Sequence, residues 1–209
     1  MQRILIADDH IFIRKGLIQV LLTEFPSADI VETNNAEDLL AKAFAEKWDL
    51  IITDISMPGR SGLDTLAEIH QHSPSLPVVV LSMFTEEQYA IRALKAGASG
   101  YLNKMSAPEE LIKAINWVLL GKKYITPVIA EQMANYLEQN TEKDMHEHLS
   151  NREFEIFKML AAGKSISAIA AQICLSPSTI STYRARIMTK MHLHTNADLT
   201  LYSVEHKLV

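Results

Sequence analysis

Five polar side chains in the N-terminal part each follow a short apolar segment, and together they could handle a phosphoryl group. They are Asp8, Asp9, Asp54, Ser82 and Lys104. Three carboxylates gathered in one place repel one another unless cations compensate their charge. Mg²⁺ prefers oxygen ligands and keeps positions open for water or phosphate oxygens, and a lysine can offset one more charge. The residue types therefore predict a magnesium-dependent site that accepts a phosphoryl group.

Asp54 is the side chain that we expect to react. A carboxylate can act as a nucleophile and form an aspartyl phosphate. Mg²⁺ and the ammonium group of Lys104 would polarise the incoming group, which in-line phosphoryl transfer requires. The hydroxyl of Ser82 could then donate a hydrogen bond to the added oxygens. Each residue alone is as well explained by a helix cap or a surface charge, but that alternative is poor for the whole set.

Strands that alternate with helices must place these side chains. Strands are predicted at 4–7, 29–32, 50–53, 78–81 and 100–102, with helices near 11–24, 36–47, 62–72, 85–96 and 107–120. This alternation is typical of a parallel sheet with helices on both faces. Five strands fit the flavodoxin-like order 2-1-3-4-5. Because parallel strands end at one edge, we expect the polar side chains to meet there.

The C-terminal part predicts a small all-α domain. Ser150-Asn151-Arg152-Glu153 is a capping box at the start of one helix, and Gly163 ends that helix. Ser165 opens a shorter second helix, and Ser176-Pro177 supplies the N-cap and first residue of a third. Two helices joined by a turn of three or four residues indicate a helix-turn-helix.

The third helix of this domain has a small, polar outer face. Its apolar side carries Ile180, Ile187 and Met191. Small residues let a helix enter the major groove, and basic residues reach phosphates. An ordinary solvated helix is the alternative that periodicity leaves open. The residues that we expect to face DNA are Ser178, Ser181, Thr182, Ala185, Arg184, Arg186 and Lys190.

Composition and charge are compatible with two soluble modules. The 209 residues are 48% hydrophobic and 22% charged. Residues 1–124 and 125–148 each carry a net charge of −4, and residues 149–209 carry +3. This asymmetry suggests different partners for the two ends, with nucleic acid as a candidate for the basic end. A net charge of +3 is also ordinary for a protein surface, and charge alone favours that explanation. With no apolar run near about 18 residues, no secretory signal and a single cysteine, Cys174, we expect a cytoplasmic protein without a membrane segment.

A linker is predicted between the modules. Thr126 and Pro127 are typical of a helix start, which predicts a helix near 127–139. Residues 140–148 are polar and aperiodic, and we expect them to be irregular and flexible. The histidines of this half lack the ligand spacing of a zinc site, so no metal is expected there. They are His146, His148, His192 and His194.

Residues 1–122 resemble the receiver domain of bacterial two-component response regulators. The motifs that carry this resemblance are Asp8-Asp9, Asp54 with Met57-Pro58-Gly59 and Gly62, Ser82, Lys95-Ala96-Gly97-Ala98 and Lys104. The resemblance implies that Asp54 is the phosphoacceptor. It implies that Asp9, Asp54 and the backbone carbonyl of Ser56 hold Mg²⁺, with Asp8 adjacent.

The resemblance also implies a switch. The Ser82 hydroxyl would move toward the phosphoryl group, and the Tyr101 ring would follow it inward, with Lys104 beside them. Many receivers have a proline after the lysine, often with a cis peptide bond. Met105 stands at that position here, so no cis bond is expected.

Residues 149–209 resemble the LuxR-type helix-turn-helix. The matching motifs are Leu149-Ser150-x-Arg152-Glu153, Gly163-Lys164-Ser165, Ile169-Ala170, Leu175-Ser176, Ser178-Thr179-Ile180-Ser181 and Arg184-Ala185-Arg186-Ile187. Family members often have lysine and histidine at the positions of Ser181 and Tyr183, so the resemblance implies DNA binding but does not carry the family's base-reading pattern over to this chain. A fourth helix, capped by Thr195, corresponds to the family's dimerisation helix. Plain core packing is the alternative for its apolar residues, and the two roles are compatible.

With 123–148 as the linker, the whole chain resembles the NarL/FixJ class of response regulators. This implies a transcription regulator that a sensor histidine kinase phosphorylates and that binds double-stranded promoter DNA as a homodimer. Two other classes stay open: a magnesium-dependent phosphohydrolase or phosphotransferase, and a DNA-binding protein that needs no phosphorylation. The first would leave the basic C-terminal domain unexplained, so we expect a regulator and not an enzyme.

Overall fold

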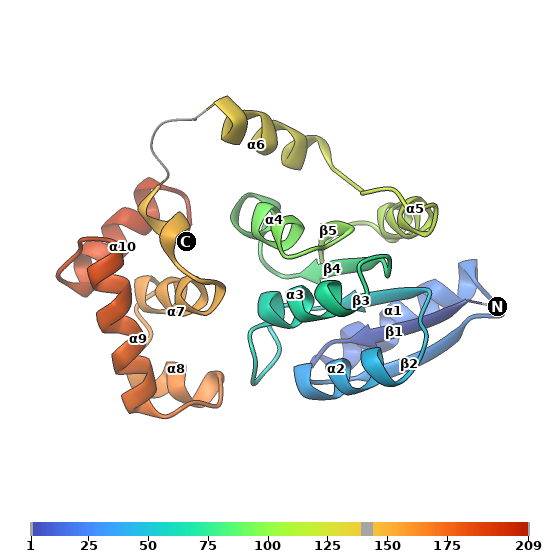
Figure 1. The fold of residues 1–209 in the computed structure, drawn as a ribbon, viewed down its shortest axis with the longest axis horizontal. Coiled ribbons are helices and arrows are strands. Elements are labelled where there is room, and N and C mark those ends of the chain that lie inside the picture. Colours follow the sequence, from blue (N-terminus) through green and yellow to red (C-terminus); the bar gives the residue numbers. More distant parts are fainter. Residues whose placement is uncertain (1, 139–143, 209) are drawn as a thin grey trace. The chain divides into compact units, whose positions relative to one another are not determined.

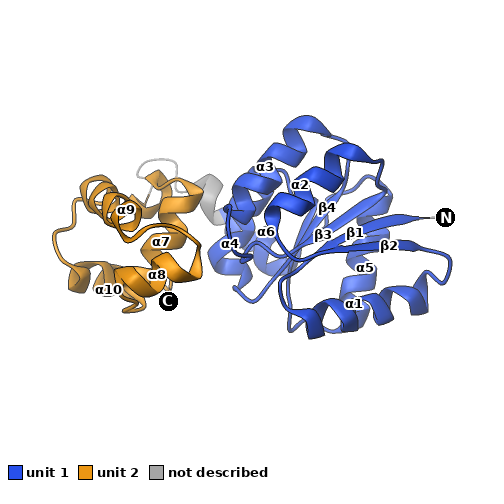
Figure 2. Cartoon of the chain, turned by 90° about the horizontal axis from the view of Figure 1, so that it is seen from below, with its two compact units in different colours: residues 1–134 blue, residues 135–209 orange. Residues whose placement is uncertain are grey.

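The computed structural model describes residues 2–138 and 144–208. The chain divides into two compact units, Met1–Ala134 and Asn135–Val209, which Figure 2 shows in different colours. This division falls inside the predicted linker, and the functional boundaries at 122/123 and 148/149 stay a prediction. In the described part of the chain, no helix is both long and apolar enough to cross a bilayer.

The first unit is a five-stranded parallel sheet with the order β2-β1-β3-β4-β5. Its strands are β1 (Arg3–Ala7), β2 (Asp29–Thr33), β3 (Leu50–Thr53), β4 (Val78–Ser82) and β5 (Gly100–Asn103). Its helices are α1 (Ile11–Glu24), α2 (Ala36–Ala45), α3 (Gly62–His72), α4 (Glu86–Lys95) and α5 (Pro108–Leu119). Helix α6 (Pro127–Glu138) begins in this unit and ends beyond its last residue, Ala134. Helices α1 and α5 cover one face of the sheet, and α2 and α3 cover the other (Figures 1 and 2). The flavodoxin-like order predicted from the sequence is confirmed.

Strand β3 brings Asp54 to the functional edge of this sheet. It lies between β1 and β4, and all four of its residues are buried. A continuous apolar run is what a parallel strand with both faces covered requires. Ala7 of β1 lies beside Thr53 of β3, so the residues that follow them, Asp8 and Asp54, emerge as neighbours.

Gly62 begins α3 at a point where no side chain fits. A Cβ atom there would lie 2.4 Å from the Cα atom of Ile55 and 2.5 Å from its carbonyl oxygen. We expect Gly62→Ala to lower the free energy of unfolding by about 3 kcal/mol, because the loop after Asp54 must move to admit the methyl group. Urea unfolding followed by circular dichroism measures this change.

Gly16, in α1, is the matched control. A Cβ atom at Gly16 would meet nothing within 4 Å. Since alanine is the better helix former by roughly 1 kcal/mol, Gly16→Ala should unfold at the same or a higher urea concentration than the wild type. Equal midpoints for Gly62→Ala and the wild type would contradict the close approach at Ile55.

The second unit is helical. Between residues 144 and 208 its elements are a 3₁₀ helix η1 (Met145–His148) and the α-helices α7 (Asn151–Ala161), α8 (Ile166–Gln172), α9 (Pro177–Lys190) and α10 (Asn196–Glu205). The predicted capping box of Ser150 and Glu153 is present, and Ser176 caps α9 with Pro177 in its first turn. Helices α8 and α9 are joined by a short turn in which Cys174 has a φ of 53°. The predicted helix-turn-helix is confirmed.

The linker helix begins where the sequence predicts it, at Pro127. The prediction that residues 140–148 lack regular structure is wrong for the last four of them. Residues Met145–His148 form η1. The backbone N–H and the ring Nδ1 of His146 lie 3.4 Å and 2.9 Å from the hydroxyl oxygen of Tyr202 in α10. This contact joins residues 56 positions apart, and a local pattern of polar residues cannot show it. Residues 140–143 lie outside the described part.

Candidate phosphorylation site and DNA-facing helix

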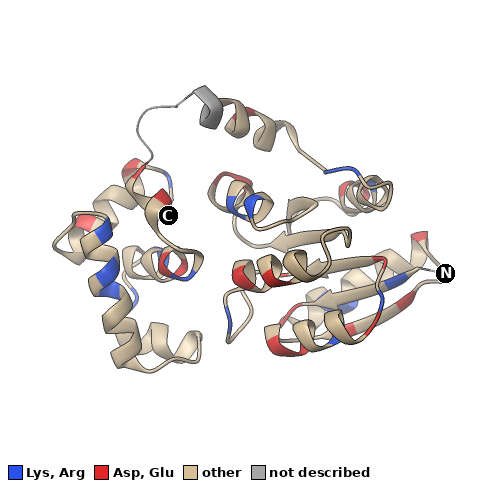
Figure 3. Ribbon diagram, in the orientation of Figure 1, with Lys and Arg blue, Asp and Glu red and all other residues tan. Residues whose placement is uncertain are grey.

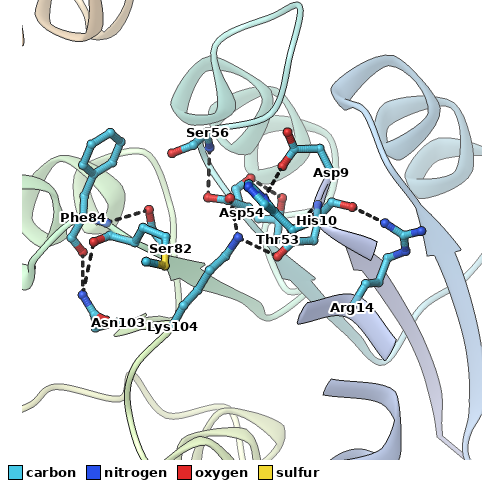
Figure 4. A network of polar contacts seen from close by, with 12 residues as sticks. Asp9, His10, Arg14, Thr53, Asp54, Ser56, Ser82, Phe84, Asn103 and Lys104 are labelled. Atoms are coloured by element: carbon cyan, nitrogen blue, oxygen red, sulfur yellow. Dashed lines mark hydrogen bonds and ion pairs between the residues drawn. The ribbon is translucent and has the colours of Figure 1, made fainter. Parts of the chain in front are cut away.

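Three of the predicted residues meet at the carboxyl edge of the sheet (Figure 4). The Nζ atom of Lys104 lies 2.7 Å from Oδ2 of Asp8 and 2.6 Å from Oδ2 of Asp54. All three side chains are at most 3% exposed. Burial by itself lowers the pKa of Lys104, but the two carboxylates outweigh it and raise the pKa above its usual value. The protonated Lys104 therefore compensates part of the negative charge of this pocket.

The same edge gathers ligand atoms that could hold a metal ion. Asp8, Asp9, His10 and Asp54 each offer one such atom, and these atoms lie within 4.8 Å of one another. The Nδ1 atom of His10 is 2.7 Å from Oδ1 of Asp9. Carboxylate oxygens at this spacing fit a hard divalent cation. Sequence reasoning missed His10, although its place directly after Asp8-Asp9 was a usable signal.

Backbone groups and one arginine hold the two buried carboxylate residues in place. The backbone N–H of Ser56 donates to Oδ1 of Asp54 over 3.0 Å, and that of His10 donates to Oδ1 of Asp8 over 2.8 Å. Arg14 donates to the Asp8 carbonyl and, through Nε, to Glu32. The Asp54 carboxylate is thus fixed from two sides, by Ser56 and by Lys104. The role predicted for the Ser56 carbonyl stays a prediction.

The segment after β4 connects the two predicted switch residues. The backbone N–H of Phe84 donates to Oγ of Ser82 over 3.3 Å. The hydroxyl of Tyr101 donates to the Phe84 carbonyl over 2.9 Å. Both Ser82 and Tyr101 are completely buried, and burial raises the pKa of the Tyr101 phenol, which stays protonated and able to donate. Phe84, which no sequence motif marked, therefore lies between the two.

The peptide bond between Lys104 and Met105 is trans, as expected for a bond without proline. Asn103, the residue before this lysine, donates through Nδ2 to the Phe84 carbonyl over 3.3 Å. The end of β5 is thus tied to the segment after β4 by two side chains, those of Asn103 and Tyr101.

Helix α9 has the predicted division into a buried and an exposed face. Ile180, Ile187 and Met191 are completely buried. The exposed residues of the predicted DNA-facing set are Ser178, Ser181, Thr182, Ala185, Arg186 and Lys190. A shallow hollow of about 260 Å³ is lined by Ser178, Thr179, Thr182, Tyr183 and Arg186. This face is small and hydroxyl-rich, and Figure 3 shows the basic residues that α9 carries.

Two of the predicted DNA-facing residues also hold the domain together. The Nζ atom of Lys190 lies 2.6 Å from Oε2 of Glu153, the capping-box residue of α7. The Nε atom of Arg184 donates to Asn196 at the start of α10 over 2.8 Å. Contacts between these two side chains and DNA stay a prediction. The sequence carried no sign of either tertiary bond.

Helix α10 has one buried and one exposed apolar side. Leu199 is completely buried, whereas Leu201 and Val204 are 61% and 59% exposed. Two exposed aliphatic side chains three positions apart lie on the same face of a helix. Leu201 and Val204 therefore form an exposed apolar strip on α10.

Comparisons with known proteins agree with both halves of this description. A family model described as the response regulator receiver domain matches residues 4–116. A second one, described as bacterial regulatory proteins of the luxR family, matches residues 147–203. The two matches coincide with the sheet unit and the helix-turn-helix.

Relatives and solved structures match over almost the full length. The response regulator GacA of Pseudomonas aeruginosa is 34% identical over 211 residues, which cover 100% of this chain and 98% of that protein. The response regulator UvrY of Escherichia coli K12 is 33% identical over 210 residues, with 100% and 96% covered. RcsB from Salmonella enterica serovar Typhimurium, bound to promoter rprA in the presence of the phosphomimetic BeF3-, gives a TM-score of 0.63 at 25% identity, with 97% and 98% covered. The chain belongs to the response regulators of the NarL/FixJ class, in which a receiver domain precedes a LuxR-type helix-turn-helix domain.

Proposed function

We propose that this chain is a transcription regulator that a sensor histidine kinase switches on by phosphorylating Asp54. The observation that carries the proposal is the buried group formed by Asp54, Asp8 and Lys104 at the edge of the sheet. It combines a nucleophilic carboxylate with a fixed positive charge, and both are held away from bulk water.

The chemistry follows from these residues. A carboxylate oxygen of Asp54 attacks the phosphorus atom of a phosphohistidine, the P–N bond breaks, and an acyl phosphate forms on Asp54. Lys104, which already contacts this carboxylate, stabilises the charge that spreads over the phosphoryl oxygens. Asp9, Asp54 and the Ser56 carbonyl would hold Mg²⁺, with Asp8 adjacent. Bound Mg²⁺ would supply further neutralisation of the phosphoryl oxygens.

The switch starts at Ser82. When its hydroxyl turns toward the phosphoryl oxygens, the backbone N–H of Phe84 loses its acceptor. The segment that Tyr101 holds through the Phe84 carbonyl then settles into a second arrangement. Because the phosphoryl group on Asp54 makes more favourable contacts in this second arrangement, phosphorylation shifts the population of molecules toward it. The shifted receiver favours a homodimer.

In the dimer, α9 of each protomer enters the major groove at one of two half-sites of promoter DNA. The exposed face with Leu201 and Val204 in α10 is the contact between the DNA-binding domains. RcsB of Salmonella, which is similar in fold over almost the full length, has been solved bound to promoter DNA. Binding of promoter DNA supports a cytoplasmic location for this regulator.

Binding of promoter DNA tests the proposed function. Addition of Mg²⁺ and a small phosphodonor should raise the affinity of the wild type by about tenfold, since coupling of this kind is typically worth 1–3 kcal/mol. The same treatment should leave the affinity of Asp54→Asn unchanged. Equal gains for both proteins would contradict a switch at Asp54.

Arg186→Ala should weaken DNA binding to all sequences to a similar degree, because an exposed arginine beside a small-residue face reaches phosphates and not base edges. The slope of log affinity against log salt concentration should fall by about one. Fluorescence anisotropy on two unrelated duplexes at several salt concentrations measures both effects. Arg60→Ala is the control, since Arg60 lies in the receiver and pairs with Glu68. A loss confined to one base position would show that Arg186 reads a base.

A further inference from the structure

The first turn of the linker helix α6 is bonded to the first turn of α4. The hydroxyl of Thr126, the residue before α6, donates to Oε2 of Glu86. The Oγ1 atom of Thr126 in turn accepts the backbone N–H of Ile129 over 3.3 Å, which is the bond of a helix N-cap. One hydroxyl group therefore serves both helices: it caps α6, and Glu86 of α4 orients it.

This junction is enclosed by the receiver. Thr126 is 5% exposed and Ile129 is completely buried. Tyr124, two residues before the cap, is also buried and forms a bridge with Gly100 of β5. Burial raises the pKa of Glu86, the bond from Thr126 lowers it, and neighbouring acidic residues raise it again, with a net increase.

Glu86 comes two residues after Phe84, the residue that contacts both switch residues, Ser82 and Tyr101. The carbonyl of Phe84 accepts a hydrogen bond from the Tyr101 hydroxyl, and its backbone N–H donates one to Oγ of Ser82. Its ring stacks on that of Tyr89 in α4, with centroids 4.5 Å apart. A movement of Phe84 would therefore shift α4 in two ways. The backbone connects Phe84 to Glu86 at the start of the helix, and the ring of Phe84 packs on that of Tyr89.

We infer that the Glu86–Thr126 contact is the point at which the linker helix senses the state of the phosphorylation site. Glu86 and Thr126 are positioning residues, and the inference rests on the function proposed above. Phosphorylation draws Ser82 away from Phe84, the start of α4 moves, and Glu86 releases the Thr126 hydroxyl. The cap of α6 is lost, and the helix that leads to the DNA-binding domain loosens at its first turn.

Amide exchange at Ile129 in the full-length protein reads this contact directly. With Mg²⁺ and beryllofluoride as the phosphoryl analogue, exchange of the Ile129 N–H in the wild type should become about fivefold faster, the effect of losing one N-cap. Thr126→Val keeps the shape of the side chain and removes the hydroxyl. In this variant the Ile129 N–H should exchange fast even without beryllofluoride, and adding beryllofluoride should not change its exchange rate. Thr126→Ser, the matched control, keeps the hydroxyl and should behave as the wild type does.

Intact mass after treatment with a small phosphodonor, measured on the same proteins, separates this inference from the proposed function. Phosphoryl uptake should be the same within about twofold in all three proteins, because Thr126 lies outside the acidic pocket. Normal uptake with an unresponsive Ile129 in the wild type would overturn the inference alone. A responsive Thr126→Val would overturn it as well. Absence of uptake by the wild type would overturn both.

Discussion

Asp54→Asn should take up no phosphoryl group under conditions in which the wild type takes up one. Asparagine has nearly the same shape as aspartate, and its one amide oxygen can accept either from Lys104 or from the backbone N–H of Ser56, which donate to Oδ2 and Oδ1 of Asp54 in the wild type. It has no nucleophilic carboxylate, and no acyl phosphate can form. Intact mass spectrometry after incubation with Mg²⁺ and a small phosphodonor measures the uptake.

Asp9→Asn is the informative companion variant. Asp9 belongs to the metal-binding group, but it is not the acceptor. Its loss should slow phosphoryl uptake, and a higher Mg²⁺ concentration should restore part of the rate. If Asp54→Asn gained the mass of one phosphoryl group, Asp54 would not be the sole acceptor, and the assignment of the site would be wrong.

Lys104→Ala should have the largest effect on stability. Its ammonium group lies between the carboxylates of Asp8 and Asp54, and all three are almost completely buried. Removing one partner of a buried ion pair leaves an uncompensated charge, which costs about 3–5 kcal/mol. A divalent cation that binds the folded pocket should return part of this loss. Urea unfolding with and without Mg²⁺ measures both effects.

Lys113 provides the control for this variant, since it is an exposed lysine in α5. Lys113→Ala should change the free energy of unfolding by no more than about 0.5 kcal/mol, with or without Mg²⁺. Lys104→Ala should in addition take up phosphoryl groups slowly, because the transferred group loses a positive charge beside Asp54. An unfolding midpoint equal to that of the wild type would contradict the role given to the Lys104 contacts.

The sequence predicted the site because its residues are tied to the ends of strands. Asp8 and Asp54 follow adjacent strands, and the parallel arrangement alone brings such ends together. The caps of the helices were equally local: the Ser150 and Glu153 box needs only residues three positions apart. Each feature that depends only on the end of a strand or the start of a helix could therefore be predicted from the local sequence.

Contacts between distant segments were not predictable in this way. Nothing near Phe84 in the chain shows that Tyr101 donates to its carbonyl, and nothing near Thr126 shows that Glu86 accepts from it. The 3₁₀ helix at Met145–His148 was not predictable for the same reason. Each of these features depends on a partner that only the folded arrangement supplies. The contacts of Phe84 and Thr126 are also the ones that we propose to link the phosphorylation site to α4 and α6.

The oligomeric state of the phosphorylated protein tests the central claim most directly. Sedimentation of the wild type and of Asp54→Asn, each treated with Mg²⁺ and a phosphodonor, should be compared with intact mass on the same samples. The account predicts a wild-type dimer with one phosphoryl group on each protomer and a monomeric, unmodified Asp54→Asn. A fully phosphorylated wild type that stays monomeric, or an Asp54→Asn variant that dimerises under the same treatment, would contradict it.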